Sequence, residues 1–209
     1  MGGRALTGRA VAPVGRAVTA ETELLAAMLA RAFHDDPVLG WVVPRDDRRP
    51  AVGRRIFALR LKHLLPHAEV YTTGDCAGAA LWAPPGQWKE GLGEFLAQLT
   101  LAPRVGRRAP RVLRGLARVE AAHPHPPHYY LAVLGTEPDR QGEGIGTRLL
   151  APVLEDCVAN GIPAYLESSQ ERNLSFYARH GFRVTGEIDL PSGPRVWLMW
   201  RDPLGWPRG

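Results

Sequence analysis

The sequence predicts an α/β domain in which helices flank a mixed β-sheet, and three stretches of its second half support this class. Residues His128–Thr136 form a strand-like apolar run, followed by a glycine-rich turn and an amphipathic stretch with apolar spacings of three and four. Ile162–Ser168 is a second strand. A strand–helix–strand unit implies a parallel pair with a right-handed crossover. Phe182–Asp189 and Pro194–Trp200 then form a closing hairpin.

The first half supplies further strands and helices, each bounded by turn or breaker residues. Thr19 is a candidate N-cap for a helix whose apolar face runs from Leu24 to Phe33. Gly74-Asp75 is a two-residue turn of the kind that favours a hairpin. In chain order, we expect a strand at Pro13–Val18, a helix from Thr19 to Phe33, a helix at Asp47–Leu65, strands at Ala68–Thr73 and Cys76–Trp82, helices at Gln87–Leu101 and Arg107–Ala122, and a proline-rich connector at His123–Pro127. The connector's histidines lack a metal-ligand pattern, so we expect no metal there.

The segment from His34 to Pro44 has two interpretations. Pro37 disfavours helical geometry at Asp36, so the preceding helix ends near this point. In the functional interpretation, His34, Asp35, Asp36 and Trp41 belong to a loop that faces the substrate, where the acids would hold an amine. In the other interpretation the helix simply ends and Trp41 packs on the core.

Length and composition indicate one globular domain. The chain has 209 residues, 45% of them apolar, and we assign residues 11–203 to the domain, with tails at 1–10 (flexible) and 204–209. No apolar run approaches the roughly 18 residues of a membrane span, and the N-terminus lacks the apolar core of a signal peptide. Cys76 and Cys157 lack a metal-ligand spacing, which favours reduced thiols in a cytoplasmic protein.

The net charge of +5 comes mostly from arginine. The densest cluster of arginines has two interpretations. It is either a solvated helix face or a basic rim that attracts an anionic cofactor. No nucleic-acid recognition motif accompanies the charge, so we expect neither a nucleic-acid nor a membrane partner. The cluster comprises Arg104, Arg107, Arg108, Arg111, Arg114 and Arg118.

The glycine-rich turn has the features of an anion-binding site. The first turn of a helix has N–H groups without partners and a partial positive charge. Gly142, Gly144 and Gly146 remove side chains that would keep a phosphate away from those groups. The glycine spacing matches neither the dinucleotide-binding fingerprint nor the nucleotide-triphosphate loop. The alternative to an anion-binding site is a plain tight turn between strand and helix.

The same turn resembles the pyrophosphate loop of the GNAT acetyltransferases, Q/R-x-x-G-x-G/A, with Gln141, Gly144 and Gly146 at the defining positions. Downstream, YLESS, then Asn173, then FYARHGF from Phe176 to Phe182 resemble the rest of a GNAT domain in the right order. Residues 165–201 resemble in particular the puromycin N-acetyltransferase branch. The resemblance implies a single GNAT domain whose mixed sheet contains a splayed parallel strand pair.

The resemblance also implies acetyl-CoA as co-substrate, with no metal. The pantetheine arm would pair with the strand edge, the pyrophosphate would take the loop amides, and Asn173 would hold the pantetheine side. The implied cofactor-binding residues are Leu134, Gly135, Thr136, Gln141, Gly142, Glu143, Gly144, Ile145, Gly146, Thr147, Asn173 and Phe176.

Amine attack on a thioester needs a neutral amine, a polarised carbonyl and a proton for the thiolate. Tyr177 occupies the family's general-acid position, and a core aromatic is the alternative. Glu167, at the end of the second parallel strand, is the first candidate for the base. Glu137, at the end of the other strand, is the second, whereas Glu143 belongs to the phosphate loop. A backbone N–H near Leu134 would polarise the carbonyl.

The sequence thus predicts an acetyl-CoA-dependent N-acetyltransferase that acts on a primary amine of a small molecule. A puromycin-like aminonucleoside or another antibiotic amine is one possible acceptor, which would make the enzyme a resistance factor. Without a nucleophile–base pattern, we expect direct transfer in a ternary complex, by a monomer or homodimer. The alternatives are a protein or peptide N-acetyltransferase and a non-catalytic acyl-CoA sensor.

Overall fold

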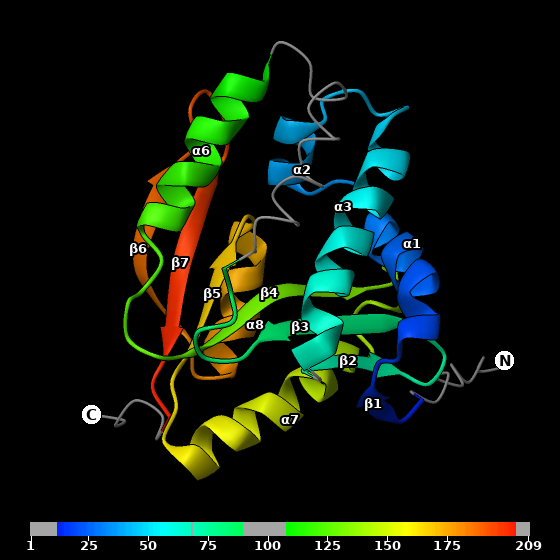
Figure 1. The fold of residues 1–209 in the computed structure, drawn as a ribbon, viewed down its shortest axis with the longest axis vertical. Coiled ribbons are helices and arrows are strands. Elements are labelled where there is room, and N and C mark those ends of the chain that lie inside the picture. The colour runs from blue at the N-terminus through cyan, green and yellow to red at the C-terminus, as the bar shows by residue number, and fades with distance from the viewer. Residues whose placement is uncertain (1–11, 68, 90–107, 204–209) are drawn as a thin grey trace, which may run out of the picture.

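A computed structural model describes residues 12–67, 69–89 and 108–203 as helices around one mixed β-sheet (Figure 1). The strand order in the sheet is β1-β2-β3-β4-β5-β7-β6. Only β4 and β5 pair in parallel, and the other neighbours are antiparallel. This arrangement confirms the predicted α/β class and the parallel pair. The strands are β1 (Val14–Arg16), β2 (Val70–Thr73), β3 (Gly78–Ala83), β4 (Tyr129–Thr136), β5 (Ala164–Ser168), β6 (Arg183–Asp189) and β7 (Arg195–Arg201).

Helices cover both faces of the sheet. Figure 1 shows α1 and α3 together on one side of the central strands and α7 on the other. Every helix that the structure describes is too short or too polar to cross a lipid bilayer. The α-helices are α1 (Thr22–Ala32), α2 (Pro37–Val42), α3 (Arg49–Leu64), α6 (Ala109–Ala121), α7 (Ile145–Asn160) and α8 (Leu174–Arg179), and short 3-10 turns lie at Thr19–Glu21, Leu65–His67, Pro138–Arg140 and Glu171–Asn173.

Strand alternation divides the core into two layers. Leu81 and Val133 face α1 and α3, whereas Trp82 and Leu131 face α7. Strand β3 is buried throughout, as expected for a central strand covered on both faces. Gly135 lets α1 approach β4, because a Cβ at this position would lie 2.7 Å from Leu29 Cδ2. Burial of each large apolar side chain contributes about 1.5–3 kcal/mol, so these two layers hold the sheet between the helices.

The parallel pair opens partway along its length. Leu81 pairs with Val133 and Trp82 with Leu131, which leaves Ala132 as an extra residue in β4. Such a bulge bends its strand. Pairing between β4 and β5 ends at Leu131 and Leu166, immediately before that bulge. The remainder of β4 therefore diverges from β5, as the family resemblance implied.

The closing hairpin is confirmed, with β7 rather than β6 next to β5. In Figure 1, α6 runs alongside β7 and β6. Val112 of α6 packs with Leu190 and Val196 of the hairpin and with Trp41 of α2. The middle of the chain is thereby tied to the C-terminal strands.

The helical region before β2 begins differently from the prediction. Thr19 starts a 3-10 turn and does not cap α1, which begins at Thr22. The Thr22 hydroxyl donates to the Thr19 carbonyl over 2.7 Å, so the turn and the helix are joined by a local hydrogen bond.

Helix α2 lies where the sequence suggested a loop or a helix end. Asp36 is extended, and its Oδ1 accepts hydrogen bonds from the amides of Val38 and Leu39, both over 2.9 Å. Pro37 occupies the first helical turn, where a missing N–H costs nothing. Helix α1 has already ended at Ala32, and Pro37 starts a new helix.

Some predictions concern residues outside the described ranges. They are the two tails, most of the expected helix Gln87–Leu101, and Arg104 and Arg107 of the arginine cluster. Residues 87–89, which are described, are not helical, so that helix does not begin at Gln87.

Candidate active site

The glycine loop between β4 and α7 has the geometry of an anion cradle. Gly142 and Gly144 have φ angles of 85° and 80°, in the left-handed region that other residues rarely adopt. No heavy atom lies within 4 Å of the position that a Cβ would take at either glycine. Gly144 is the N-cap of α7, whose first turn presents backbone N–H groups. The loop therefore fits a pyrophosphate group.

Arg140 connects the glycine loop to the turn between β2 and β3. Its Nε donates to Glu143 Oε2 over 2.6 Å, and its Nη1 donates to Asp75 Oδ2 over 3.0 Å. The guanidinium is buried, and its Nη2 has no hydrogen-bond partner among the residues that the structure describes. Because Arg140 neutralises Glu143, the carboxylate within the loop opposes a bound phosphate less than an isolated charge would.

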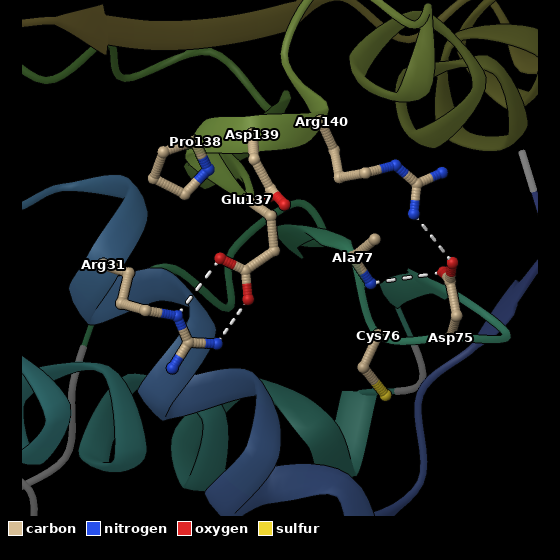
Figure 2. A pocket seen from close by; sticks show the side chains of 8 residues that line it. All are labelled: Arg31, Asp75, Cys76, Ala77, Glu137, Pro138, Asp139 and Arg140. Carbon is tan, nitrogen blue, oxygen red and sulfur yellow. Dashed lines mark hydrogen bonds and ion pairs between the residues drawn. The ribbon is translucent and has the colours of Figure 1, made fainter. Parts of the chain in front are cut away.

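A pocket of about 520 Å³ lies beside Arg140, between the C-terminal end of α1, the β2–β3 turn and the start of the loop. Figure 2 shows its two charged pairs, Arg31 with Glu137 and Arg140 with Asp75. Neither Tyr177 nor Glu167 lines it. The pocket therefore adjoins the cofactor loop and does not contain the predicted acid and base.

The remaining predicted cofactor residues lie along the diverging strand and at the start of α8. Leu134, Gly135 and Thr136 form the part of β4 beyond its pairing with β5. A Cβ at Gly146 would lie 3.1 Å from Phe176 Cζ and 3.9 Å from Leu134 Cδ2, so the loop, β4 and α8 meet here. Asn173 precedes α8, and its side chain makes no capping hydrogen bond.

Tyr177, the predicted acid, is buried in α8 with 8% of its surface exposed. Its ring contacts Phe176 and Phe182 edge-on, at centroid distances of 5.2 and 6.0 Å. Burial, and then the nearby Asp36 carboxylate, raise the pKa of the Tyr177 phenol. The phenol therefore stays protonated at neutral pH, as a proton donor must. Its packing also fits a core aromatic, so the acid role remains a prediction.

Glu167, the first candidate base, is held by groups that can exchange protons. The Tyr130 hydroxyl donates to Glu167 Oε2 over 2.6 Å. His123 Nδ1 lies 3.6 Å from the other oxygen, Oε1. The Glu167 side chain is 11% exposed. Glu167 follows Leu166, the last residue of β5 that pairs with β4, so it lies where the two strands part.

Glu137, the second candidate, has a different environment. Arg31 Nε donates to Oε2 over 3.1 Å, and Arg31 Nη2 donates to Oε1 (Figure 2). Both carboxylate oxygens are occupied by a guanidinium that does not give up its proton at physiological pH. This geometry favours a structural ion pair over a base.

The predicted substrate residues of the α1–α2 region do not act together. Asp35 is exposed, whereas Asp36 is buried and caps α2. Ser169 also donates to Asp36 Oδ2, which ties α2 to the end of β5. Trp41 is 7% exposed and donates from Nε1 to the Pro191 carbonyl over 3.2 Å. This placement favours the packing interpretation of Trp41.

Sequence patterns did not predict the group of aromatic and imidazole side chains that surrounds Glu167. His123 stacks on Trp88 with a centroid distance of 3.6 Å and packs edge-on against Tyr130 and Tyr165. His128 Nε2 lies 3.0 Å from His123 Nε2. The local signal was limited to the histidines of the proline-rich connector and the one that follows it. Within the described ranges, no group of three or more His, Cys, Asp or Glu side chains is arranged to hold a metal ion.

Comparisons with known proteins agree with this geometry. Residues 16–182 match the model of the acetyltransferase (GNAT) family. An uncharacterized N-acetyltransferase of Schizosaccharomyces pombe is 27% identical over 178 residues, which cover 79% of this chain and 72% of that protein.

Solved structures share the fold. A Corynebacterium glutamicum structure described as histone acetyltransferase HPA2 and related acetyltransferase has a TM-score of 0.70 at 23% identity, covering 96% of this chain and all of that one. Arylalkylamine N-acetyltransferase 2 of Aedes aegypti has a TM-score of 0.62 at 12% identity, covering 91% and 98%. Polyamine N-acetyltransferase of Drosophila melanogaster has a TM-score of 0.59 at 16% identity, covering 90% and 98%.

The family match spans most of the chain and includes the glycine loop, the opened strand pair and α8. GNAT enzymes use acetyl-CoA as co-substrate, which suits the loop described above. This family assignment favours an enzyme over a sensor. The chain belongs to the acetyltransferase (GNAT) family and is one of its N-acetyltransferases.

Proposed function

We propose that this enzyme transfers the acetyl group of acetyl-CoA directly to the primary amine of a small molecule while both substrates are bound. One observation carries the proposal. Strands β4 and β5 part after Leu131 and Leu166, the glycine loop follows β4, and Glu167 lies on β5 where the gap opens. Donor and acceptor can thus approach the same gap.

The donor side is formed by the loop, the free edge of β4 and the start of α8. Acetyl-CoA, when bound, supplies the activated acetyl group. The amides from Gln141 to Thr147 would hold its pyrophosphate, and residues 134–136 would pair with the pantetheine arm. Asn173 and Phe176 would line the other side of that arm. A backbone N–H near Leu134 would stabilise negative charge on the carbonyl oxygen.

The acid and base would act at opposite ends of the reaction. Glu167 would remove a proton from the acceptor ammonium, because only the neutral amine is nucleophilic. Tyr177 would donate its phenolic proton to the departing sulfur. The raised pKa of Tyr177 means that the phenol still carries this proton at neutral pH when the thiolate leaves.

Direct transfer is supported by the state of the two cysteines. Burial raises the pKa of the Cys157 thiol to about 11. Burial, and then the neighbouring Glu21 carboxylate, raise the pKa of Cys76. Thiols with raised pKa values form little of the nucleophilic thiolate at neutral pH. Neither cysteine is therefore suited to carry an acetyl group between substrates.

A small acceptor is supported by the side chains that cover Glu167, which we call the cover. Trp88, His123 and His128 all belong to the long segment between β3 and β4. Trp88 stacks on His123 beside the Glu167 carboxylate. This cover suits a pocket for a small amine better than an open groove for a polypeptide.

The acceptor panel follows from chemistry and from relatives. Two structural neighbours are named for the amines they acetylate, an arylalkylamine and a polyamine, and both classes contain primary amines. The resemblance of residues 165–201 to the puromycin branch adds an aminonucleoside, and with it a role in antibiotic resistance.

The two free thiols continue to suggest a reducing cytoplasm. We expect a monomer or homodimer.

The direct test is release of free thiol from acetyl-CoA in the presence of puromycin, polyamines, arylalkylamines, aminoglycosides or short peptides. We expect turnover with at least one small amine, and initial-rate patterns that require both substrates before either product leaves. Turnover with peptides alone, or a ping-pong pattern, would contradict the proposal.

Tyr177→Phe tests the acid. We expect kcat to fall about 100-fold or more, in the range for general acid catalysis. The affinity for acetyl-CoA, measured by calorimetry, should stay unchanged because the aromatic ring remains in α8. A variant with normal kcat would show that Tyr177 is only a core aromatic.

A further inference from the structure

A buried chain of hydrogen-bonding groups continues from Glu167 away from Tyr130. His123 Nδ1 lies 3.6 Å from Glu167 Oε1, and His123 Nε2 lies 3.0 Å from His128 Nε2. His128 Nδ1 lies 2.6 Å from the carbonyl oxygen of Pro126. The chain therefore runs from a carboxylate through two imidazoles to a backbone carbonyl.

The fixed end of this chain determines where its protons lie. A carbonyl only accepts, so His128 Nδ1 carries a hydrogen and donates it to Pro126. Burial lowers the pKa of His128, which keeps this ring neutral and leaves its Nε2 as an acceptor. His123 Nε2 must then carry a hydrogen and donate it to His128. One position stays open: His123 Nδ1, which faces Glu167 Oε1.

The His123 side chain is only 3% exposed, so burial opposes a positive charge on the ring and its neighbours must offset that cost. The Trp88 ring stacks on His123 at a centroid distance of 3.6 Å. The face of an indole attracts a cation. The titratable groups that pack around His123 are Glu167, His128, Tyr130 and Tyr165.

Only one of those neighbours supplies a negative charge at neutral pH. Burial, and then the Glu167 carboxylate, raise the pKa of Tyr165, so this phenol stays neutral. Tyr130 donates its hydroxyl hydrogen to Glu167. Glu167 therefore supplies the charge that would stabilise a protonated His123.

We propose that His123 stores the proton that Glu167 removes from the acceptor ammonium, so that the pair acts as one base. This inference rests on the proposed function and adds to it a positioning residue that acts through Glu167 and does not touch the acceptor. His128 fixes the tautomer of His123, and Tyr130 orients the Glu167 carboxylate.

The proton balance needs no further reactant. An N–H bond of the ammonium breaks, and the proton passes to the Glu167 carboxylate. It then moves from Oε1 to His123 Nδ1, which forms an imidazolium next to a carboxylate. The amine is left neutral for attack. Its nitrogen loses a second proton as the amide forms, and that proton replaces the one that Tyr177 gives to the departing thiolate. Water takes the proton stored on His123 after the products leave.

Nuclear magnetic resonance of the imidazole nitrogens tests the pair in the resting full-length chain, without turnover. At high pH we expect His123 to carry hydrogen on Nε2 only, and on lowering the pH to gain one on Nδ1. His128 should keep its Nδ1–H tautomer throughout. Glu167→Gln should move the His123 titration to lower pH, because the imidazolium loses its carboxylate partner.

The pH dependence of kcat/KM tests the role in the reaction. An imidazole takes up its proton nearer to neutrality than a carboxyl group does. We therefore expect His123→Gln to move the acidic limb of the profile to lower pH and to reduce kcat, while KM for acetyl-CoA stays unchanged. In His128→Gln, the amide oxygen can still accept a hydrogen bond from His123 Nε2. The acidic limb of the kcat/KM profile should therefore stay at the same pH. His125→Gln is the matched control, because His125 is exposed on the same connector.

The outcomes separate this inference from the proposed function. A His123 titration that does not move in Glu167→Gln overturns the pair, whatever the activity. An active His123→Gln variant with an unchanged acidic limb overturns the storage role and leaves the proposed function standing. Absence of acetylation with any amine, alongside the expected titration shift, would overturn the proposed function and with it the catalytic use of the pair.

Discussion

Two glutamates lie at corresponding ends of the two parallel strands, and their surroundings differ. Glu137 follows β4, is 21% exposed and is clamped by Arg31, whose side chain is 56% exposed. Glu167 in β5 is 11% exposed, accepts a hydrogen bond from the Tyr130 hydroxyl, and has His123 Nδ1 at 3.6 Å from its other oxygen. By sequence position alone, both were candidates for the base.

The comparison shows that the partners of a carboxylate decide what it can do. A guanidinium keeps its proton at any physiological pH, so the Arg31–Glu137 pair is a fixed link between α1 and the cofactor loop. A phenol and an imidazole can give and take protons, so the group around Glu167 can respond to a substrate. Three substitutions would break or sharpen this contrast.

Glu167→Gln should have the largest effect. The amide preserves shape but cannot accept a proton, so we expect kcat/KM for the amine to fall by about 10²–10⁴, the usual contribution of a general base. Acetyl-CoA affinity, measured by calorimetry, should stay the same. A rate within a few fold of the parent enzyme would mean that water or another group is the base.

Tyr130→Phe should have an intermediate effect. It removes the 2.6 Å hydrogen bond to Glu167 Oε2 and keeps the ring. A hydrogen bond to a charged group contributes about 1.5–3 kcal/mol, so we expect kcat to fall about 10-fold or more. Steady-state kinetics at saturating acetyl-CoA would measure it. An unchanged kcat would show that the orientation of Glu167 does not depend on Tyr130.

Glu137→Gln should have the smallest effect. The Arg31 side chain of this pair is 56% exposed, and solvent-exposed ion pairs contribute at most about 1 kcal/mol. We expect a correspondingly small loss in the free energy of unfolding, measured with denaturant, and a kcat within about twofold of the parent. A large loss of kcat would return Glu137 to the list of candidate bases.

Local patterns predicted the part of the fold to which we assign the cofactor. Alternating apolar residues, three glycines and a helical repeat together defined β4, the loop and α7. The closing hairpin followed from Pro191-Ser192-Gly193 in the same way. These elements depend on neighbours in the chain, so one sequence was enough to identify them.

The acceptor side depends on contacts between residues far apart in sequence. His123 meets Glu167 across 44 positions, and Trp88 meets His123 across 35. The sequence suggested only a stiff connector with unassigned histidines. Helix α2 was missed because Asp36 and Pro37 signal both the end of one helix and the start of another.

The assignment of the base to Glu167 is tested most directly by measuring thiol release from acetyl-CoA in Glu167→Gln and Glu137→Gln side by side, with saturating acetyl-CoA and an accepted primary amine. We expect the Glu167 variant to lose nearly all of its rate and the Glu137 variant to keep it. Equal losses in the two variants, or a greater loss in the Glu137 variant, would contradict the assignment of the base to β5.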